Sequence, residues 1–379
     1  MTRQKPEFIT TSHSLEQLVA RLCQERVLAC DLEGDSLHHY QERVCLIQLS
    51  TGEGSFLVDP LAIDDMSPLA PLMADPSIKK VFHGADYDIR SLHRDFGIEV
   101  CNLFDSMIAC QLLGEKEVGL AAVLKKRFGV ELDKKFQKAD WSRRPLSEGM
   151  IDYAIRDTIL LIELYRQLER ELAARGRLAW LEEECELLSR VRATGRNEEP
   201  LFSRFKGAAR MDGRTLAVLE ELLRFRDEKA RIRDVPPFKV LGNEQVRALA
   251  EKKPHKPADL QSVPGMPAAV AERYCKEILA AVARGIATPA EQLPRFPRLE
   301  RVARDPKQEG RLKILKRWRE KKAEVLGMEA GILANNNLLE GLAEAVPFSL
   351  EQLDLVCHMK KWQKREFGAE IISILARGD

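Results

Sequence analysis

The second half of this 379-residue chain repeats itself at a constant spacing of 93 residues. Two of the matched pairs are Arg224-Phe225-Arg226 with Arg317-Trp318-Arg319, and Leu249-Ala250-Glu251 with Leu342-Ala343-Glu344. A repeat that keeps one register without a gap is typical of two copies of one structural unit. Because the hydrophobic period in this half is helical throughout, the repeat predicts two small helical domains, at residues 211–290 and 306–379.

The first half alternates strand-like and helix-like patterns. Three short apolar runs, at residues 27–32, 44–50 and 55–59, are separated by loops of hairpin length, which predicts three adjacent antiparallel strands. Two later runs, at residues 80–83 and 100–104, each precede a helical pattern, as the parallel strands of β-α units do. These patterns predict an α/β domain with a mixed sheet covered by helices.

Three helices of the first half are predicted from their own signals. A capping-box pattern at residues 14–17 predicts a helix that continues to about residue 24. Farther on, a 3.6-residue period predicts one long helix near residues 147–175 and another near residues 179–192. After the polar stretch at residues 194–200 the sequence predicts no strand.

Composition excludes several other classes of protein. With 45% hydrophobic and 31% charged residues, the chain falls in the globular range. No apolar run approaches the ~20 residues of a membrane helix, and the start of the chain has no apolar signal core. We therefore expect a cytoplasmic protein without a membrane partner. No two cysteines are spaced as Cys-x-x-Cys, which disfavours zinc and disulfide frameworks.

The net charge of +1 conceals a difference between the two halves. Residues 1–210 carry 29 Lys and Arg against 34 Asp and Glu, whereas residues 211–379 carry 31 against 25. An acidic half suits a site that binds cations, and a basic half suits contact with a nucleic-acid backbone.

Aromatic residues in the repeats differ in what they predict. Phe225 and Trp318 occupy the same repeat position, which favours a place in the core of each copy. Trp362 is matched by Ala269 in the first copy, so the repeat gives it no such constraint and a surface position is favoured.

Three acidic patterns carry the strongest chemical signal. Asp31 and Glu33 end an apolar strand, and residues two apart on a strand point to the same face. Asp88 lies near a helix start, with Asp86 as a competing acid. Tyr153-Ala-Ile-Arg-Asp157 places a phenol and a carboxylate on one helix face. Taken singly, each pattern also fits an ordinary strand end, helix cap or half-buried helix face.

Taken together, the three patterns resemble the exonuclease motifs of the DEDD superfamily, whose fold is ribonuclease H-like. A Tyr four residues before the last Asp marks the tyrosine subclass, whereas the histidine subclass has His at the position of Asp152. The segment at residues 138–146 resembles one of the ribonuclease D family, although His83-Gly84 stands where many members have Asn. The two repeats resemble HRDC domains, and the resemblance assigns residues 1–210 to the exonuclease domain.

This resemblance implies a hydrolase that shortens RNA from its 3′ end and releases 5′-nucleotides. Asp31, Glu33, Asp88 and Asp157 would bind two divalent metal ions, Mg²⁺ or Mn²⁺, and Tyr153 would orient the attacking water. A free phenol has a pKa of ~10, which makes orientation the expected role rather than proton removal at neutral pH.

The expected partner is RNA, in particular tRNA precursors with an unpaired 3′ tail. By the same resemblance Glu33 would also contact the terminal ribose. Basic residues near the third motif could line the substrate path, namely Lys134, Lys135, Arg143 and Arg144, although a solvated surface explains them equally well. For Asp105 we expect a structural helix cap. Two alternatives remain at this point: a 3′–5′ DNA exonuclease, and a catalytically inactive nucleic-acid-binding protein.

Overall fold

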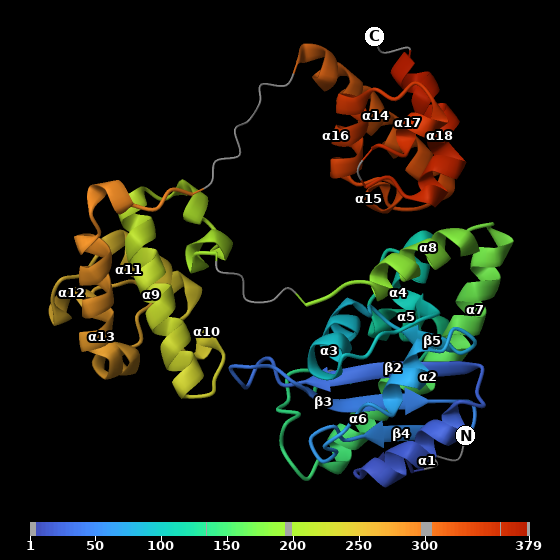
Figure 1. Ribbon diagram of the computed structural model, residues 1–379, viewed down its shortest axis with the longest axis horizontal. Coiled ribbons are helices and arrows are strands. Elements are labelled where there is room, and N and C mark those ends of the chain that lie inside the picture. Colours follow the sequence, from blue (N-terminus) through green and yellow to red (C-terminus); the bar gives the residue numbers. More distant parts are fainter. Residues whose placement is uncertain (1–4, 134, 194–198, 297–304, 357, 377–379) are drawn as a thin grey trace. The chain divides into compact units, whose positions relative to one another are not determined.

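A mixed six-stranded sheet forms the centre of the first domain (Figure 1). The computed structural model describes residues 5–133, 135–193, 199–296, 305–356 and 358–376. In spatial order the strands are β1 (Glu7–Ile9), β4 (Ser55–Val58), β3 (Val44–Ser50), β2 (Val27–Gly34), β5 (Lys79–Phe82) and β6 (Leu103–Asp105). The β2-β3-β4 meander is antiparallel, and β5 and β6 continue the sheet in parallel with β2. This confirms the predicted mixed sheet, while β1 was not predicted.

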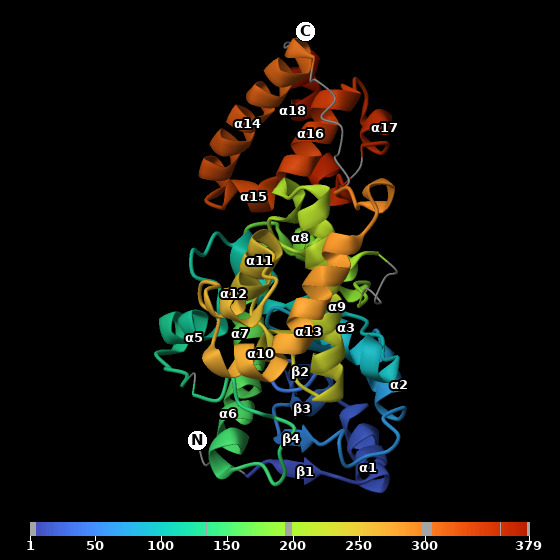
Figure 2. The ribbon, with the colours of Figure 1, turned by 90° about the vertical axis from the view of Figure 1, so that its left-hand side faces the viewer.

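Helices cover both faces of the sheet (Figures 1 and 2). In chain order they are α1 (Ser12–Leu22), α2 (Leu69–Ala74), α3 (Asp86–Phe96), α4 (Ser106–Leu112), α5 (Leu120–Phe128), α6 (Glu148–Ile159), α7 (Leu161–Ala174) and α8 (Leu178–Ser189). One of them, α6, packs across β2, β3 and β4. It thereby lies over the strand that carries the first acidic pattern.

Two predicted helices differ from those observed. The first begins earlier, because Thr11 is its N-cap and forms the capping box with Ser14, which was itself predicted to open the helix. The predicted long helix is two helices, α6 and α7, separated at Leu160. Near this break the Thr158 hydroxyl donates to the carbonyl of Ile155, an arrangement that bends helices.

Among the described residues of the second half, all regular secondary structure is helical. Short 3₁₀ turns at Leu201–Arg204 and Ala208–Arg210 precede the first copy, which contains α9 (Gly213–Ile232), α10 (Pro237–Val240), α11 (Asn243–Lys252), α12 (Pro257–Gln261) and α13 (Ala268–Ala287). A further turn at Ala290–Gln292 precedes the second copy, which contains α14 (Pro306–Leu326), α15 (Ala330–Leu333), α16 (Asn336–Ala345), α17 (Leu350–Leu353) and α18 (Lys361–Ala376). No helix in the described part of the chain is long and apolar enough to cross a membrane.

The two helical copies also repeat their side-chain contacts. Arg226 donates to Asn243 at 2.7 Å, and Arg319 donates to Asn336 at 3.0 Å, one repeat later. Phe225 and Trp318 are both buried, as the repeat predicts. The register found in the sequence therefore reflects one packing scheme that is used twice.

The chain divides into two compact units. One contains Met1–Gly34, Val44–Ala193 and Ala303–Asp379, and the other contains Asp35–Arg43 and Thr194–Val302. Within the second unit, the Tyr40 hydroxyl donates to Asp227 at 2.7 Å, and His39 contacts Asp234 at 2.6 Å. The loop between β2 and β3 thus belongs to the unit of the first helical copy.

Within the first unit, the second helical copy packs on α8. Trp362 is buried at 1% exposure and stacks on Trp180 with ring centroids 4.5 Å apart, so the predicted surface position of Trp362 is wrong. Glu183 accepts hydrogen bonds from the first backbone N–H groups of α18, and Glu184 accepts one from the Trp362 indole at 3.0 Å. The repeat could not reveal this, because the partner of Trp362 lies outside both copies.

Candidate active site

Strand β2 places Asp31 and Glu33 on one face of the sheet, the face that α6 covers. The strand is apolar up to Cys30, and its register pairs Asp31 with Gln48 and Glu33 with Leu46 on β3. A β-bulge at Glu33–Gly34 then ends the regular pairing. The two carboxylates are consequently held by a central strand, which is paired on both sides.

The second motif is positioned by a turn between β5 and α3. Gly84 has a φ of +77°, and a Cβ there would meet Met107 Cε at 3.3 Å, so the position requires glycine. Asp105 is fully buried and accepts hydrogen bonds from the Gly84 and Ala85 backbones and from the first turn of α4. The helix cap expected for Asp105 is therefore present, and the same carboxylate also fixes the turn that leads to Asp88.

Of the two acids in this motif, Asp88 is the one that joins the site. It is 7% exposed, and its charge acts on both Asp31 and Glu33. Asp86 is exposed and forms an ion pair with Arg90 at 2.7 Å one helical turn on. The structure therefore favours Asp88 over Asp86, the two acids between which the sequence did not decide.

Helix α6 brings the third motif to the same place. Ser147 caps its start, and Tyr153 and Asp157 lie one turn apart near its end. Asp31, Glu33 and Asp157 each offer a carboxylate oxygen within 4.8 Å of the other two. Two segments that are far apart in the sequence, β2 and α6, therefore converge, and Asp88 of α3 acts electrostatically on Asp31 and Glu33. We define the acidic cluster as Asp31, Glu33, Asp88 and Asp157.

Burial and mutual repulsion act strongly on this acidic cluster. Burial raises the pKa of Glu33 to about 9 and the pKa values of Asp88 and Asp157 to about 7. For Asp31, burial and then the charges of Asp88 and Glu33 raise the pKa well above its usual range. In the protein alone, the four groups therefore resist being charged together.

A divalent cation fits this donor set. Hard cations take carboxylate oxygens as ligands, and a positive charge removes the repulsion that raises these pKa values. Burial, followed by the charges of Asp157 and Glu33, raises the pKa of Tyr153 above its ordinary range. Its hydroxyl therefore keeps its proton at neutral pH and can donate a hydrogen bond beside the cluster.

A cavity of about 210 Å³ adjoins Tyr153 and Asp157. It is lined by Leu132, Asp133, Lys135, Phe136, Gly149, Asp152, Tyr153, Arg156 and Asp157. Phe136 packs edge-on against Tyr153 with ring centroids 6.2 Å apart. Phe136 and Arg156 were not predicted as site residues, although Arg156 lies inside the third motif and its spacing from Tyr153 was a usable signal.

The predicted substrate-contacting residues have different surroundings. Lys135 lines this cavity, with its ammonium 5.4 Å from the Phe136 ring centroid. Arg143 is largely exposed and pairs with Asp140 at 3.1 Å. Lys134 lies outside the residues that the structure describes.

The side chain of Arg144 is hydrogen-bonded to other residues of the protein. Its guanidinium binds both carboxylate oxygens of Asp59, at 2.6 and 2.7 Å, and donates to the carbonyls of Cys45, Trp141 and Arg143. These bonds use all five N–H donors of the side chain. A phosphate would have to displace one of them to reach Arg144, and the observed role is to anchor the segment before α6.

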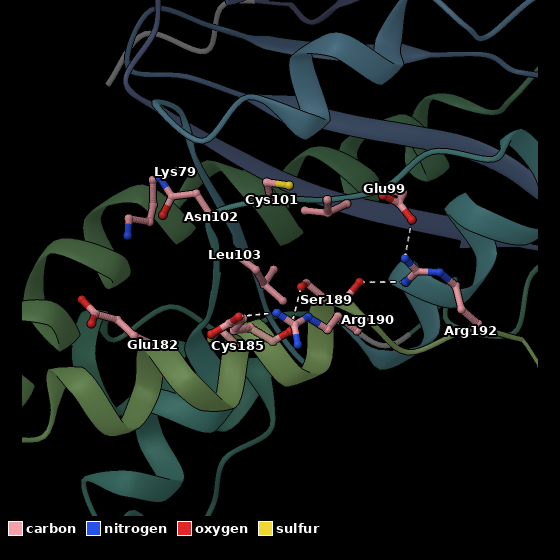
Figure 3. Close-up of a pocket in the computed structure, with 12 residues that line it drawn as sticks. Lys79, Glu99, Cys101, Asn102, Leu103, Glu182, Cys185, Ser189, Arg190 and Arg192 are labelled. Atoms are coloured by element: carbon pink, nitrogen blue, oxygen red, sulfur yellow. Dashed lines mark hydrogen bonds and ion pairs between the residues drawn. The ribbon is translucent and has the colours of Figure 1, made fainter. Parts of the chain in front are cut away.

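The larger cavity, of about 410 Å³, lies at the amino ends of β5 and β6 (Figure 3). None of the four residues of the acidic cluster lines it. Lys79 and Leu103, which begin these two strands, line it together with residues of α8. Its arginines are already paired, Arg190 with Glu186 and Arg192 with Glu99. The acidic cluster, by contrast, lies toward the other end of the sheet, because Asp31 and Glu33 end a strand that runs parallel to β5.

Known proteins share both the sequence and the fold. Residues 6–173 match the family described as a 3′–5′ exonuclease, and residues 215–282 and 308–375 each match the HRDC domain. Ribonuclease D of Nitrobacter hamburgensis is 30% identical over 293 residues, which cover 76% of each chain. Ribonuclease D of a Jannaschia species is 29% identical over 378 residues, covering 98% of this chain and 95% of the relative.

A solved structure matches over nearly the whole chain. Escherichia coli RNase D, described as an exoribonuclease involved in structured RNA processing, has a TM-score of 0.72 and 26% identity. The match covers 99% of both chains. The likeness thus includes the helical copies as well as the domain that holds the acidic cluster.

Proposed function

Since the chain belongs to the ribonuclease D family of 3′–5′ exoribonucleases, we propose that it trims the 3′ ends of structured RNAs, with tRNA precursors as its substrates. The domains we assign are residues 1–210 for the exonuclease and residues 211–290 and 306–379 for the helical copies. Each family match lies inside one of these ranges.

The observation that carries the proposal is the convergence of Asp31, Glu33 and Asp157 within 4.8 Å, with Asp88 acting electrostatically on Asp31 and Glu33. We assign these four carboxylates as ligands of two divalent cations, Mg²⁺ or Mn²⁺. Such a pair of cations stabilises the charge on the attacking and the leaving oxygen during phosphodiester hydrolysis.

Tyr153 orients the attacking water in this mechanism. Its hydroxyl lies one helical turn from Asp157 and stays protonated, so it does not act as a base in this mechanism. Glu33, besides its charge in the cluster, accepts a hydrogen bond from the terminal ribose, which restricts attack to a free 3′ end. The product is then a 5′-nucleotide, and the chain shortens in the 3′ to 5′ direction.

The cavity beside Tyr153 suits the last nucleotides of the substrate. Lys135 and Arg156 supply positive charge for a phosphate, and Phe136 supplies an apolar face for a base. Arg143, which is exposed, adds a further positive charge for the substrate backbone. The same role expected for Lys134 stays a prediction from the sequence, because Lys134 lies outside the described residues. The basic second half binds the phosphates of the folded part of the RNA, and this binding weakens as the salt concentration rises.

A degradation time course tests the proposal. The substrate is a 5′-labelled tRNA with an unpaired 3′ tail, compared with DNA of matched sequence, with Mg²⁺ or with chelator. We expect stepwise shortening of the RNA tail that stops with chelator and with Asp157→Ala, but continues with Asp86→Ala, which removes an exposed acid outside the cluster. Faster loss of the DNA would assign the protein to the DNA exonucleases, and RNA binding without any cleavage would identify an inactive binding protein.

A further inference from the structure

Gln48 is a buried amide beside the acidic cluster that has no hydrogen-bond partner. Its side chain is 0% exposed, and neither Nε2 nor Oε1 is bonded within the described structure. A buried amide without partners costs free energy, and most such groups in proteins are satisfied. An unsatisfied amide at this place therefore requires an explanation.

The sheet register places Gln48 next to Asp31. The two residues are paired directly across β2 and β3, so their side chains share the face covered by α6 and their Cβ atoms are about 5 Å apart. On its other side, Gln48 is paired with Leu57 of β4. Of the two residues directly opposite Gln48, Asp31 and Leu57, only Asp31 is polar.

The neighbours of Gln48 along β3 offer no alternative partner. Leu46 is apolar, and the Ser50 hydroxyl is already engaged with Ser55 at 2.9 Å and Thr158 at 2.8 Å. The Ser50–Thr158 bond ties β3 to α6 directly after Asp157. Gln48 therefore lies directly opposite Asp31 of β2, two residues before the serine that bonds to α6.

We propose that Gln48 is a positioning residue of the metal centre, and that its amide N–H donates to the Asp31 carboxylate oxygen that a bound cation leaves free. This inference rests on the proposed function, because it requires the acidic cluster to bind cations. Carboxylates that bind metals are commonly held by a second hydrogen bond of this kind. The bond fixes the orientation of Asp31 and gives the buried amide its partner in the metal-loaded protein.

Gln48→Met tests the inference, because methionine has a similar length and no N–H donor. We expect Mn²⁺ affinity, measured by calorimetry in the full-length protein, to fall by about 10- to 100-fold. Without metal, the variant should be at least as stable to heat as the parent, because it buries no unsatisfied amide. The matched control is Leu49→Met, on the opposite face of the same strand, which should keep the parent affinity.

A measurement on the unaltered protein gives an independent test. With ¹⁵N-labelled glutamine, the side-chain amide signal of Gln48, assigned by its absence in a folded Gln48→Asn or Gln48→Met variant, should shift when Mg²⁺ is added. An unshifted signal, or a Gln48→Met protein with parent Mn²⁺ affinity, overturns the inference. Failure of the parent protein itself to bind Mn²⁺ overturns the proposed function instead, so the two failures are distinguishable.

Discussion

Asp105 accepts a hydrogen bond from the backbone N–H of Ala85 at 2.7 Å, which ties the end of β6 to the turn that precedes α3. Its other carboxylate oxygen accepts from Gly84 and from the first turn of α4. One fully buried side chain therefore fixes two helix starts, and one of these helices carries Asp88.

Asp105→Asn should lower both stability and activity. The amide can replace one carboxylate oxygen, but its NH₂ group would face a backbone N–H, which leaves a buried donor unsatisfied at a cost of ~1–3 kcal/mol. Exonuclease rate per folded molecule and thermal unfolding measure the two effects. Asn335→Ala removes the N-cap of α16 and should lower stability by ~1 kcal/mol with an unchanged rate. Equal effects of both substitutions on the rate would contradict the positioning of Asp88 by Asp105.

The pKa values of the acidic cluster predict how stability depends on pH. Folding raises the pKa values of Asp88 and Asp157 to about 7 and that of Glu33 to about 9, from ordinary values near 4. Between the unfolded pKa values near 4 and the folded values of about 7 and about 9, the folded protein binds more protons than the unfolded chain. With chelator, the free energy of unfolding should therefore be highest at low pH within this window and fall as pH rises from about 4 to about 9.

Thermal unfolding in chelator, from pH 5 to pH 9, checks this expectation. Asp157→Asn should flatten the decline, because it removes one carboxyl whose charging opposes folding. Asp86→Asn, at an exposed position, should leave the slope as it is. A melting temperature that rises between pH 6 and pH 8 in chelator would show that repulsion within the cluster does not govern stability.

Tyr153→Phe should separate the orientation of water from cation binding. The variant keeps the ring contacts with Phe136 and Trp141 but loses the hydroxyl, and misplacement of the attacking water by about 1 Å costs on the order of 10²-fold in rate. The value of kcat should fall accordingly, while calorimetric Mn²⁺ affinity stays at the parent value. Tyr165→Phe is the matched control, since its hydroxyl donates to Glu169 rather than to the cluster. Parent kcat in the Tyr153→Phe protein would remove Tyr153 from the mechanism.

The features that the sequence predicted are those with a local or periodic signal. Strands β2 to β6 overlap short apolar runs of the sequence, and the constant spacing of 93 residues predicts two copies of one helical domain. The acidic motifs together resemble those of a known family, which is why Asp31, Glu33 and Asp157 could be named before their convergence was observed.

The features that the sequence did not predict depend on contacts between distant segments. The three residues of β1 pair with β4 and carry too little pattern of their own. Gln48 is one polar residue within an apolar strand, and its meaning arises from the register that places it opposite Asp31. Arg144 was named as a possible phosphate contact, and its ion pair with Asp59 was not foreseen because Asp59 lies far away in the sequence.

The stacked pair Trp180–Trp362 gives the last prediction. The first copy has Ala269 at the position of Trp362, so the helical fold itself tolerates alanine there, and the tryptophan serves the contact with α8. Trp362→Ala should destabilise the first unit by ~3–5 kcal/mol, because a fully buried indole leaves a cavity.

A double-mutant cycle with Trp180→Ala measures the contact itself. The two substitutions should be less than additive in the free energy of unfolding, with a coupling of ~0.5–1.5 kcal/mol beyond the burial of each ring. Trp318→Ala, in the core of the second copy, should destabilise by a similar amount but couple more weakly to Trp180→Ala, because the two rings are linked only through Phe367, which contacts both. Additive effects of Trp180→Ala and Trp362→Ala would mean that the second copy is stabilised by its own core and not by its contact with the exonuclease domain.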